Sequence, residues 1–266
     1  MAKANINLPI PPQFAASLGD YSMYYRKGKL VVRRKGGPKS EDIKNGSAYA
    51  KTRNQMSEFG GSSTAGKMVR DAMSSLNHLT DFNLQSRMTS VIAAIKDLDL
   101  EKSQHRSIIF SRGKHLLEGF NLSEGVTFDA IVATPVTFSI DRNERTAVLQ
   151  LPPLKPGKNF NPTAFGYPYF RFRINLGIIR DMEYVDKIGY KKLLYDPSDY
   201  TEMLDTEWYR TKSPLIGQEV GLTLVDLQLD ESCHLMLSIG IEFGTPSGMD
   251  IKPVKGAGAA KILGVV

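Results

Sequence analysis

The chain has 266 residues, of which 41% are apolar and 23% are charged, the composition of an ordinary globular protein. No run approaches the ~20 consecutive apolar residues of a membrane-spanning helix, so we expect a soluble protein without a membrane span. The single cysteine, Cys233, excludes an internal disulfide, and the proline-interrupted N-terminus lacks the apolar stretch of a secretory signal. We therefore expect cytoplasmic residence at synthesis, and later release without a Sec signal stays open.

Charge is distributed unevenly along the chain, whose formal net charge is +6. Residues 1–115 carry 19 Lys and Arg against 9 Asp and Glu, a net charge of +10. Residues 116–266 carry 15 against 19, a net charge of −4. This asymmetry suits either binding of a polyanion or contact between the basic part of one copy and the acidic part of the next.

The N-terminal region predicts an arm followed by a hairpin. Residues 1–20 contain three closely spaced prolines and predict an extended N-terminal arm. Residues 21–35 are rich in Tyr, Val and Leu, and Lys27-Gly28 in their middle is suited to a tight turn, so they predict a β-hairpin. The hairpin opens a basic hairpin and helical domain that we expect over residues 21–104.

Within this domain the apolar residues change to a helical period. A helix over residues 47–59 is expected to stop at the glycine pair 60–61, and a second and a third helix begin near residues 62 and 80. The last two helices are joined by a short turn and should pack antiparallel. Their apolar stripes are Ala65, Val69, Ala72, Leu76 and Leu79, and Leu84, Met88, Val91, Ile95 and Leu98.

Residues 105–266 change to a period of two and predict a β-domain. Strands are expected at 136–140, 147–151, 170–178, 219–229 and 235–243, with a bulge near Asp226 and a last strand at the C-terminus. About seven strands with one apolar face are typical of an antiparallel immunoglobulin-like β-sandwich. The predicted fold class is therefore α+β, with an N-terminal β-hairpin and antiparallel helices followed by that sandwich.

The sequence lacks the residue patterns of known catalytic sites. Residues 61–67 fit the phosphate-loop pattern G-x-x-x-x-G-K, but Met68 stands where a Ser or Thr would hold magnesium, so we interpret the segment as a helix stop followed by a serine cap. The four histidines are scattered and one cysteine cannot form a zinc pattern. We therefore predict no enzyme, no catalytic, cofactor or metal site, and no small-molecule substrate.

A basic ribbon is the strongest candidate contact surface. Between Asp20 and Glu41 there are seven basic residues and no acid, with tyrosines among them. Exposed Arg and Lys on a β-ribbon, with tyrosines for stacking, can bind nucleic acid, but charge on an edge hairpin also protects it from aggregation or serves a subunit contact. The candidate residues are Arg26, Lys27, Lys29, Arg33, Arg34, Lys35, Lys39, Tyr24 and Tyr25.

An acidic, aromatic segment is the second candidate surface. A calcium loop and a paired-carboxylate hydrolase are both conceivable there, but the spacing matches no calcium loop, and a solvated loop whose aromatic residues contact a partner is the simplest interpretation. The candidate residues are Asp196, Asp199, Glu202, Asp205, Glu207 and Trp208.

The N-terminal block resembles a group of bacterial proteins of similar length and without known activity. The resemblance is carried by residues 28–38, 50–53 and 58–60, by Ala65-Gly66-Lys67 with Arg70, and by Ile239-Gly240-Ile241-Glu242-Phe243. It implies a glycine-bounded hairpin, two or three helices and a β-rich C-terminal part, and it implies no mechanism.

Two functional hypotheses follow from these patterns. The first is a non-enzymatic structural protein that assembles with itself into a filament, tube or shell through extended terminal arms and opposite-charge contacts. The alternative is a nucleic-acid-binding protein that uses the basic β-ribbon and the adjacent helix face.

Overall fold

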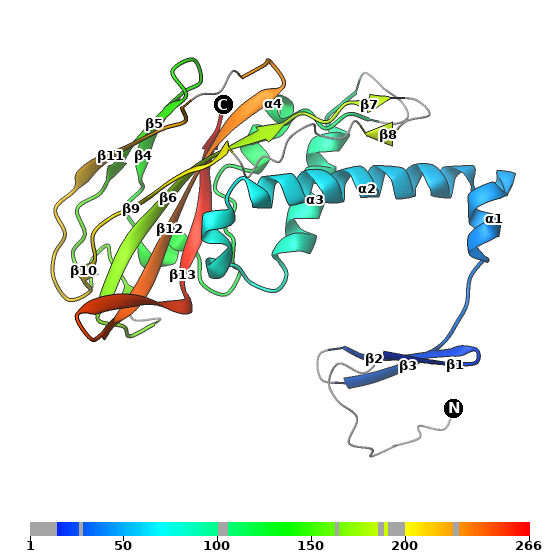
Figure 1. Cartoon of the computed structure of the whole chain (residues 1–266), viewed down its shortest axis with the longest axis horizontal. Helices are drawn as coiled ribbons and strands as arrows, with labels where there is room; N and C mark the ends of the chain where they lie inside the picture. The colour runs from blue at the N-terminus through cyan, green and yellow to red at the C-terminus, as the bar shows by residue number, and fades with distance from the viewer. Residues whose placement is uncertain are drawn as a thin grey trace. The chain divides into compact units, whose positions relative to one another are not determined.

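The computed structural model describes residues 15–26, 29–100, 106–162, 165–185, 189–190, 200–225 and 229–266 (Figure 1). It is a mixed α+β fold with antiparallel sheets, as predicted. Contacts group the chain into two compact units, residues 1–53 and 54–266. The predicted division after residue 104 runs through the second unit, and each unit is described below by itself.

The first unit is a small antiparallel sheet followed by short helices. Three strands pair in the order β1 (Ala15–Leu18), β2 (Tyr21–Arg26) and β3 (Lys29–Arg34). The predicted hairpin is therefore present, and the end of the predicted arm adds a third strand to it. The predicted turn at residues 27–28 and the rest of the arm, residues 1–14, lie outside the described residues.

The helical part of this unit consists of α1 (Ser40–Asn45) and the 3₁₀ turn η1 (Ser47–Tyr49). Arg53 connects it to the next helix, because its Nη1 donates to the backbone oxygens of Ile43 at 2.8 Å and Gly46 at 2.7 Å.

Helix α2 (Ala50–Asp71) corrects the predicted stop at the glycine pair. The helix continues through Gly60 and Gly61, so the segment that fits a phosphate loop is helix interior. A Cβ on Gly61 would lie 2.1 Å from the Cε2 atom of Tyr190, so this glycine makes room for an aromatic ring rather than ending the helix. Propensity alone predicts a stop, and tertiary packing overrides it.

The apolar stripe of the predicted second helix is buried as expected, but three of its five residues, Ala72, Leu76 and Leu79, lie beyond the end of α2. After Asp71 the chain enters a 3₁₀ helix, η2 (Ser74–Leu79). The backbone oxygen of Ala72 accepts from the Asn175 side chain at 2.7 Å, and that of Ser75 accepts from Arg173 Nη1 at 3.2 Å. Side chains of the sheet thus satisfy helix-end carbonyl groups that an α-helix would use internally.

Helix α3 (Leu84–Asp97) corresponds closely to the predicted third helix and its apolar stripe. Leu84, Met88 and Ile95 are buried, whereas Leu98 is exposed. Gly66 of α2 faces Met88 and Thr89, and the Lys96 ammonium pairs with the carboxylate of Glu58 at 2.7 Å. The earlier residue of α2 thus contacts the later residue of α3, and the later residue of α2 contacts the earlier part of α3, so the two helices are antiparallel.

The second unit contains two larger antiparallel sheets and several short elements. The large sheet has the order β10-β6-β12-β13, with β9 also pairing with β6, and the small sheet has the order β11-β5-β4. The predicted strand over 219–229 begins as β11, and its predicted bulge lies outside the described residues. The strand bounds are β4 (Thr137–Asp141), β5 (Thr146–Leu151), β6 (Tyr169–Arg180), β9 (Glu202–Asp205), β10 (Tyr209–Arg210), β11 (Gln218–Thr223), β12 (Cys233–Ser247) and β13 (Asp250–Val265). The short elements are α4 (Phe110–Gly113), η3 (Lys114–Leu116), α5 (Phe128–Ile131), β7 (Tyr184–Val185) and β8 (Gly189–Tyr190).

The large sheet is covered on both faces (Figure 1). One face packs against the small sheet around a core that includes Phe172, Leu149 and Leu237. The other face packs against the helices around a core that includes Met236 and Ile262. The helices and the large sheet therefore share one core, and none of the helices in the described ranges has the length and apolar character needed to cross a membrane.

Candidate functional site

The N-terminal sheet has one apolar and one polar face. Cross-strand partners lie on the same face and neighbours along a strand lie on opposite faces. The pairings Leu18↔Tyr21 and Met23↔Val32, with alternation, define the apolar face. Its members are Ala16, Leu18, Tyr21, Met23, Tyr25, Leu30 and Val32, with Arg34 at the end of β3.

The described residues of the first unit do not bury this apolar face. Leu18 is 69% exposed and Val32 is 54% exposed. Among residues 16–25 and 29–53, none is buried, and helix α1 likewise contains no buried residue. The described part of the first unit therefore forms hydrogen-bonded strands with an amphipathic pattern but has no hydrophobic core of its own.

The opposite face carries part of the predicted basic ribbon. The Arg33 guanidinium lies 5.8 Å from the ring centroid of Tyr24, and its Nε donates to the Ser22 hydroxyl at 3.4 Å. Lys29 lies on the same face by register. Arg33 and Arg34 project to opposite faces, so the ribbon does not present all its basic residues together.

The remaining basic candidates are dispersed. Arg34 pairs with Asp20 at 3.7 Å, and Lys35 Nζ donates to the backbone oxygen of Gly19 at 2.8 Å. Lys39 is the N-cap residue of α1. Tyr25 lies on the apolar face, whereas the predicted positions Arg26 and Lys27 have no described side chains.

The two units differ in charge. Residues 1–53 contain 11 Lys and Arg against 3 Asp and Glu, a net charge of +8. Residues 54–266 contain 23 against 25, a net charge of −2. The asymmetry noted in the sequence is therefore concentrated in the unit whose described residues form no hydrophobic core.

The predicted acidic segment is not one surface. Asp196 and Asp199 lie outside the described residues, and Glu202 and Glu207 are exposed at the two ends of β9. Asp205 instead points into a cluster of ion pairs. The ring of Trp208 lies 4.7 Å from the guanidinium of Arg171 in the same cluster, so its indole is not a free contact surface.

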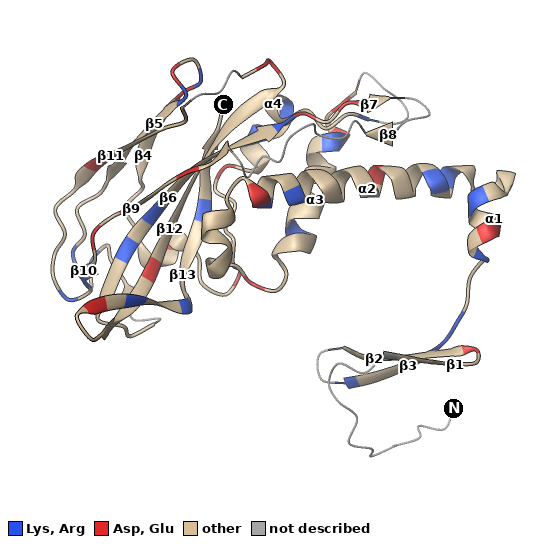
Figure 2. Cartoon of the chain, viewed as in Figure 1, with Lys and Arg blue, Asp and Glu red and all other residues tan. Residues whose placement is uncertain are grey.

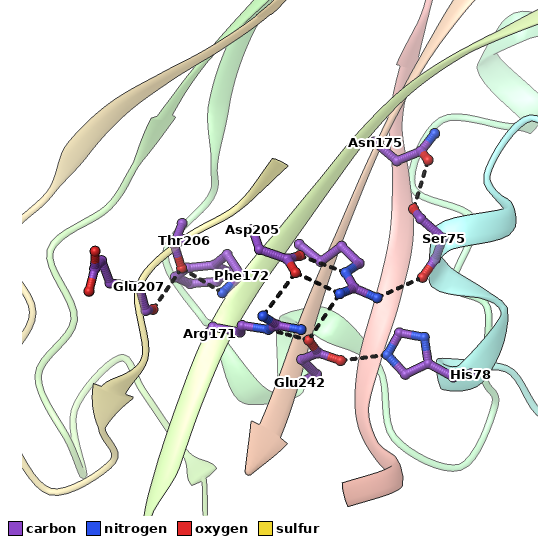
Figure 3. Close-up of polar contacts among 10 residues, drawn as sticks. Ser75, His78, Arg171, Phe172, Asn175, Asp205, Thr206, Glu207 and Glu242 are labelled. Atoms are coloured by element: carbon purple, nitrogen blue, oxygen red, sulfur yellow. Dashed lines mark hydrogen bonds and ion pairs between the residues drawn. The ribbon is translucent and has the colours of Figure 1, made fainter. Parts of the chain in front are cut away.

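That cluster is centred on Glu242, which is only 1% exposed (Figure 3). One carboxylate oxygen of Glu242 accepts from Arg171 Nε and lies 3.7 Å from Arg173 Nη2. The other oxygen lies 2.6 Å from Nε2 of His78. Arg173 also binds both oxygens of Asp205 at 2.6 Å each, the bidentate geometry that is strongest for this pair.

The cluster perturbs the titration of its members. Burial alone raises the pKa of Glu242, but the hydrogen bonds from His78 and Arg171 and the charges of Arg173 and Arg171 outweigh it and hold the pKa below its ordinary value. The hydrogen bond to Asp205 raises the pKa of Arg173. The contacts of Glu242 and Asp205 with the two arginines and His78 join η2 to strands β6, β9 and β12.

Sequence patterns did not identify this cluster. Arg171 and Arg173 alternate with Phe170 and Phe172 along β6, and such alternation is typical of a strand with one solvent-exposed face. In the structure that polar face is covered by η2. Figure 2 shows the basic residues of β6 beside the acidic residue of β12, an adjacency that follows from the register Arg171↔Glu242.

The polar groups of this cluster are paired with one another. Both carboxylate oxygens of Glu242 are in contact with arginine or histidine side chains. His234, adjacent to Cys233 in the sequence, lies 3.0 Å from Oδ1 of Asp181. No group of three or more His, Cys, Asp or Glu residues within the described ranges is placed to hold a metal ion.

A groove in the second unit is the other feature that a ligand or partner could occupy. It has a volume of about 620 Å³ and lies between α2 and the first half of α3. Phe59 and Phe82 line it, with small residues including Ser63, Ser86 and Ala93.

Comparison with protein-family models, curated proteins and solved structures gave no match for this chain.

Proposed function

We propose that this chain is a non-enzymatic structural protein that assembles with itself, and that its N-terminal unit is the connector between copies. The observation that carries the proposal is the uncovered apolar face of the N-terminal sheet. Contiguous exposed apolar surface on a folded element is characteristic of a protein interaction site. A filament, tube or shell would cover this surface by repeating one contact.

The described residues leave the apolar face of the N-terminal sheet incompletely buried. A short sheet needs a packed apolar face to be stable in water. In the first unit the strands are paired and one face is mainly apolar, but no described residue of this unit packs over that face as a second layer. A partner that covers Leu18 and Val32 would supply the missing core.

The second unit buries its own hydrophobic cores. We propose that its two facing sheets are a sandwich of immunoglobulin-like kind, with the helices as a third layer. The C-terminal residues form β13, whose Ala259 and Ile262 are fully buried against the chain's own strands. We therefore assign assembly to the N-terminal unit, including its arm, rather than to a C-terminal arm.

The test compares two neighbouring positions on β1. Leu18→Glu places a charge on the apolar face, and Ser17→Glu places the same charge on the polar face of the same strand. The full-length, nuclease-treated proteins are compared by size-exclusion chromatography with light scattering and by negative-stain imaging. We expect wild type and Ser17→Glu to form large ordered particles and Leu18→Glu to be monomeric.

Two results would contradict the proposal. A monomeric wild-type protein at all concentrations would exclude self-assembly. Loss of assembly in both variants would show that charge, not the apolar face, controls the contact.

A nucleic-acid-binding function is the second candidate. It is favoured by the polar face, where Arg33 lies over Tyr24 and Lys29 is nearby in register. Phosphate contacts from such residues release counterions, so affinity should fall steeply with salt. Arg33→Glu should then abolish binding to single-stranded DNA, and Val32→Glu on the other face should weaken it far less. Equal affinity of wild type and Arg33→Glu would exclude this candidate.

A further inference from the structure

The groove between α2 and α3 is an apolar surface with an unusual composition. Phe82 is 99% exposed and Phe59 is 68% exposed, and both line the groove. Met56, one turn before Phe59 on α2, is also exposed. The groove therefore has large apolar side chains and an apolar extension along α2.

The rest of the lining is uncharged and mostly small, with Asn83 and Gln85 as its longer side chains. It includes Ser63, Ser86, Ser90 and Ala93, and none of the described lining residues carries a charge. A surface with small residues can receive large side chains from a partner, because close packing requires projections on one side to fill recesses on the other. The apolar face of the N-terminal sheet has such projections, which include Tyr21 and Met23.

Charge favours a contact between unlike units. The first unit has a net charge of +8 and the second of −2, so two N-terminal units repel one another, whereas an N-terminal unit is attracted to a second unit. Direct pairing of two N-terminal sheets, apolar face to apolar face, would bring the two most basic parts of the assembly together.

We infer that the apolar face of the N-terminal sheet of one copy docks in the α2–α3 groove of a second copy. The inference rests on the proposed self-assembly and specifies its receiving surface. The contact is heterologous, because it joins different surfaces of the two copies. Such a contact repeats without limit unless its rotation closes a ring, so it produces filaments or rings rather than dimers.

The first arm of the test uses cysteine cross-linking. The native Cys233 is buried, so a thiol introduced on the surface is the reactive one. Val32→Cys and Phe82→Cys proteins are purified separately, mixed, and treated with a short bis-maleimide. We expect a cross-linked pair only in the mixture, and neither the wild-type protein nor a mixture of Ser17→Cys with Phe82→Cys should give it.

The outcomes of the cross-linking experiment distinguish the segments that could occupy the groove. If Val32→Cys alone cross-links as efficiently as the mixture, the N-terminal sheets pair with each other. If a chain carrying both cysteines cross-links internally at high dilution, the groove is filled by its own N-terminal unit. Either result, or the absence of cross-linking in every mixture, overturns the inference.

The second arm separates this inference from the proposed function. Phe82→Glu places a charge in the groove, and Met249→Glu places one at an equally exposed apolar position in the β12–β13 turn. We expect Phe82→Glu to abolish assembly as fully as Leu18→Glu does and Met249→Glu to leave it intact. Assembly that is lost in Leu18→Glu but retained in Phe82→Glu would leave the proposed function standing and refute the groove as its receiving surface.

Discussion

The buried ion cluster provides the most quantitative test of the fold. Glu242→Gln keeps the shape of the side chain and one acceptor oxygen but removes the negative charge between Arg171 and Arg173. Removing one partner of a buried ion pair costs about 3 to 5 kcal/mol, because the remaining charge stays desolvated. Here both arginines retain Asp205 and the glutamine still accepts a hydrogen bond, so we expect a loss of about 2 to 3 kcal/mol of unfolding free energy.

The assay is urea unfolding followed by circular dichroism at pH 7. A chain of this size has an m value of about 2 to 3 kcal/mol per M, so the midpoint should fall by about 1 M. The matched control is Glu219→Gln, at an exposed carboxylate on β11 that accepts from Gln150. A surface change of this kind should stay within about 0.5 kcal/mol of wild type.

Acid provides an independent check with a definite sign. The pKa of Glu242 is lowered in the folded protein, whereas an unfolded glutamate titrates near about 4.3. Its stabilising contribution is therefore complete above that value and is lost as the pH falls through the lower folded pKa. Glutamine does not titrate, so the free-energy gap between wild type and Glu242→Gln should narrow below about pH 4.

Either of two results would contradict a stabilising role for the charge of Glu242. A gap below about 1 kcal/mol at pH 7 would show that the cluster contributes no more than an exposed ion pair. A gap that stays constant from pH 7 to pH 3 would show that the charge of Glu242 is not what stabilises the fold.

Two further predictions concern close packing and hydrogen bonding in the second unit. Gly61→Ala should destabilise the protein by about 1 to 3 kcal/mol, because the added Cβ would overlap the Tyr190 ring. Gly60→Ala has open space around it and should stabilise the protein by about 0.5 to 1 kcal/mol. Thermal unfolding compares the two variants, and equal effects on stability would contradict close packing at Gly61. Ser238→Ala should leave stability unchanged or raise it by about 1 kcal/mol, because the buried hydroxyl has no hydrogen-bond partner among the described residues. Asn175→Ala should lower stability by about 2 kcal/mol, because it leaves the backbone carbonyl of Ala72 without its donor. Urea unfolding midpoints compare the two variants, and a larger loss of stability for Ser238→Ala would refute these roles of the two side chains.

The strands were the most predictable part of the molecule. A period of two over long apolar runs predicted β6 and β12, and the strands predicted at 136–140 and 147–151 correspond to β4 and β5. The helical stripe over residues 65–79 was also correct as a pattern of burial, since Ala65, Val69 and Leu76 are fully buried. The period of the apolar residues along a segment shows which side chains face a core, and the backbone pairing follows from that period.

The errors arose where a distant segment determines the local structure. Gly61 lies in a continuous helix because Tyr190, far away in the sequence, packs against it. Just before the 3₁₀ helix over residues 74–79, the backbone lies directly on the sheet, because a Cβ on Gly177 would meet the Ala72 oxygen at 2.0 Å. Gly240 in turn makes room for the side chains of Leu76 and Leu79. Neither contact leaves a periodic pattern in its own segment.

The polar face of β6 shows why the candidate site was only partly predictable. Alternating polar residues on a strand are compatible with water or with a second buried layer, and local sequence does not distinguish the two. The layer that covers Arg171 and Arg173 is provided by η2, and their acidic partners come from β9 and β12. The two faces of the N-terminal sheet, in contrast, could be predicted, because alternation in a short hairpin directly assigns each residue to a face.

The contrast between the two units is the reason for proposing that the first one carries the function. In the second unit the sheet is covered on both faces, and its buried charges are paired through Glu242 and Asp205. Those features stabilise the unit and leave few unmet interactions. In the first unit strands, face polarity and charge are all specified, but no side chain in the described ranges is buried. We propose that another copy of the chain covers this apolar face, and the net charge of +8 in the same unit favours a neutral or acidic surface as the cover.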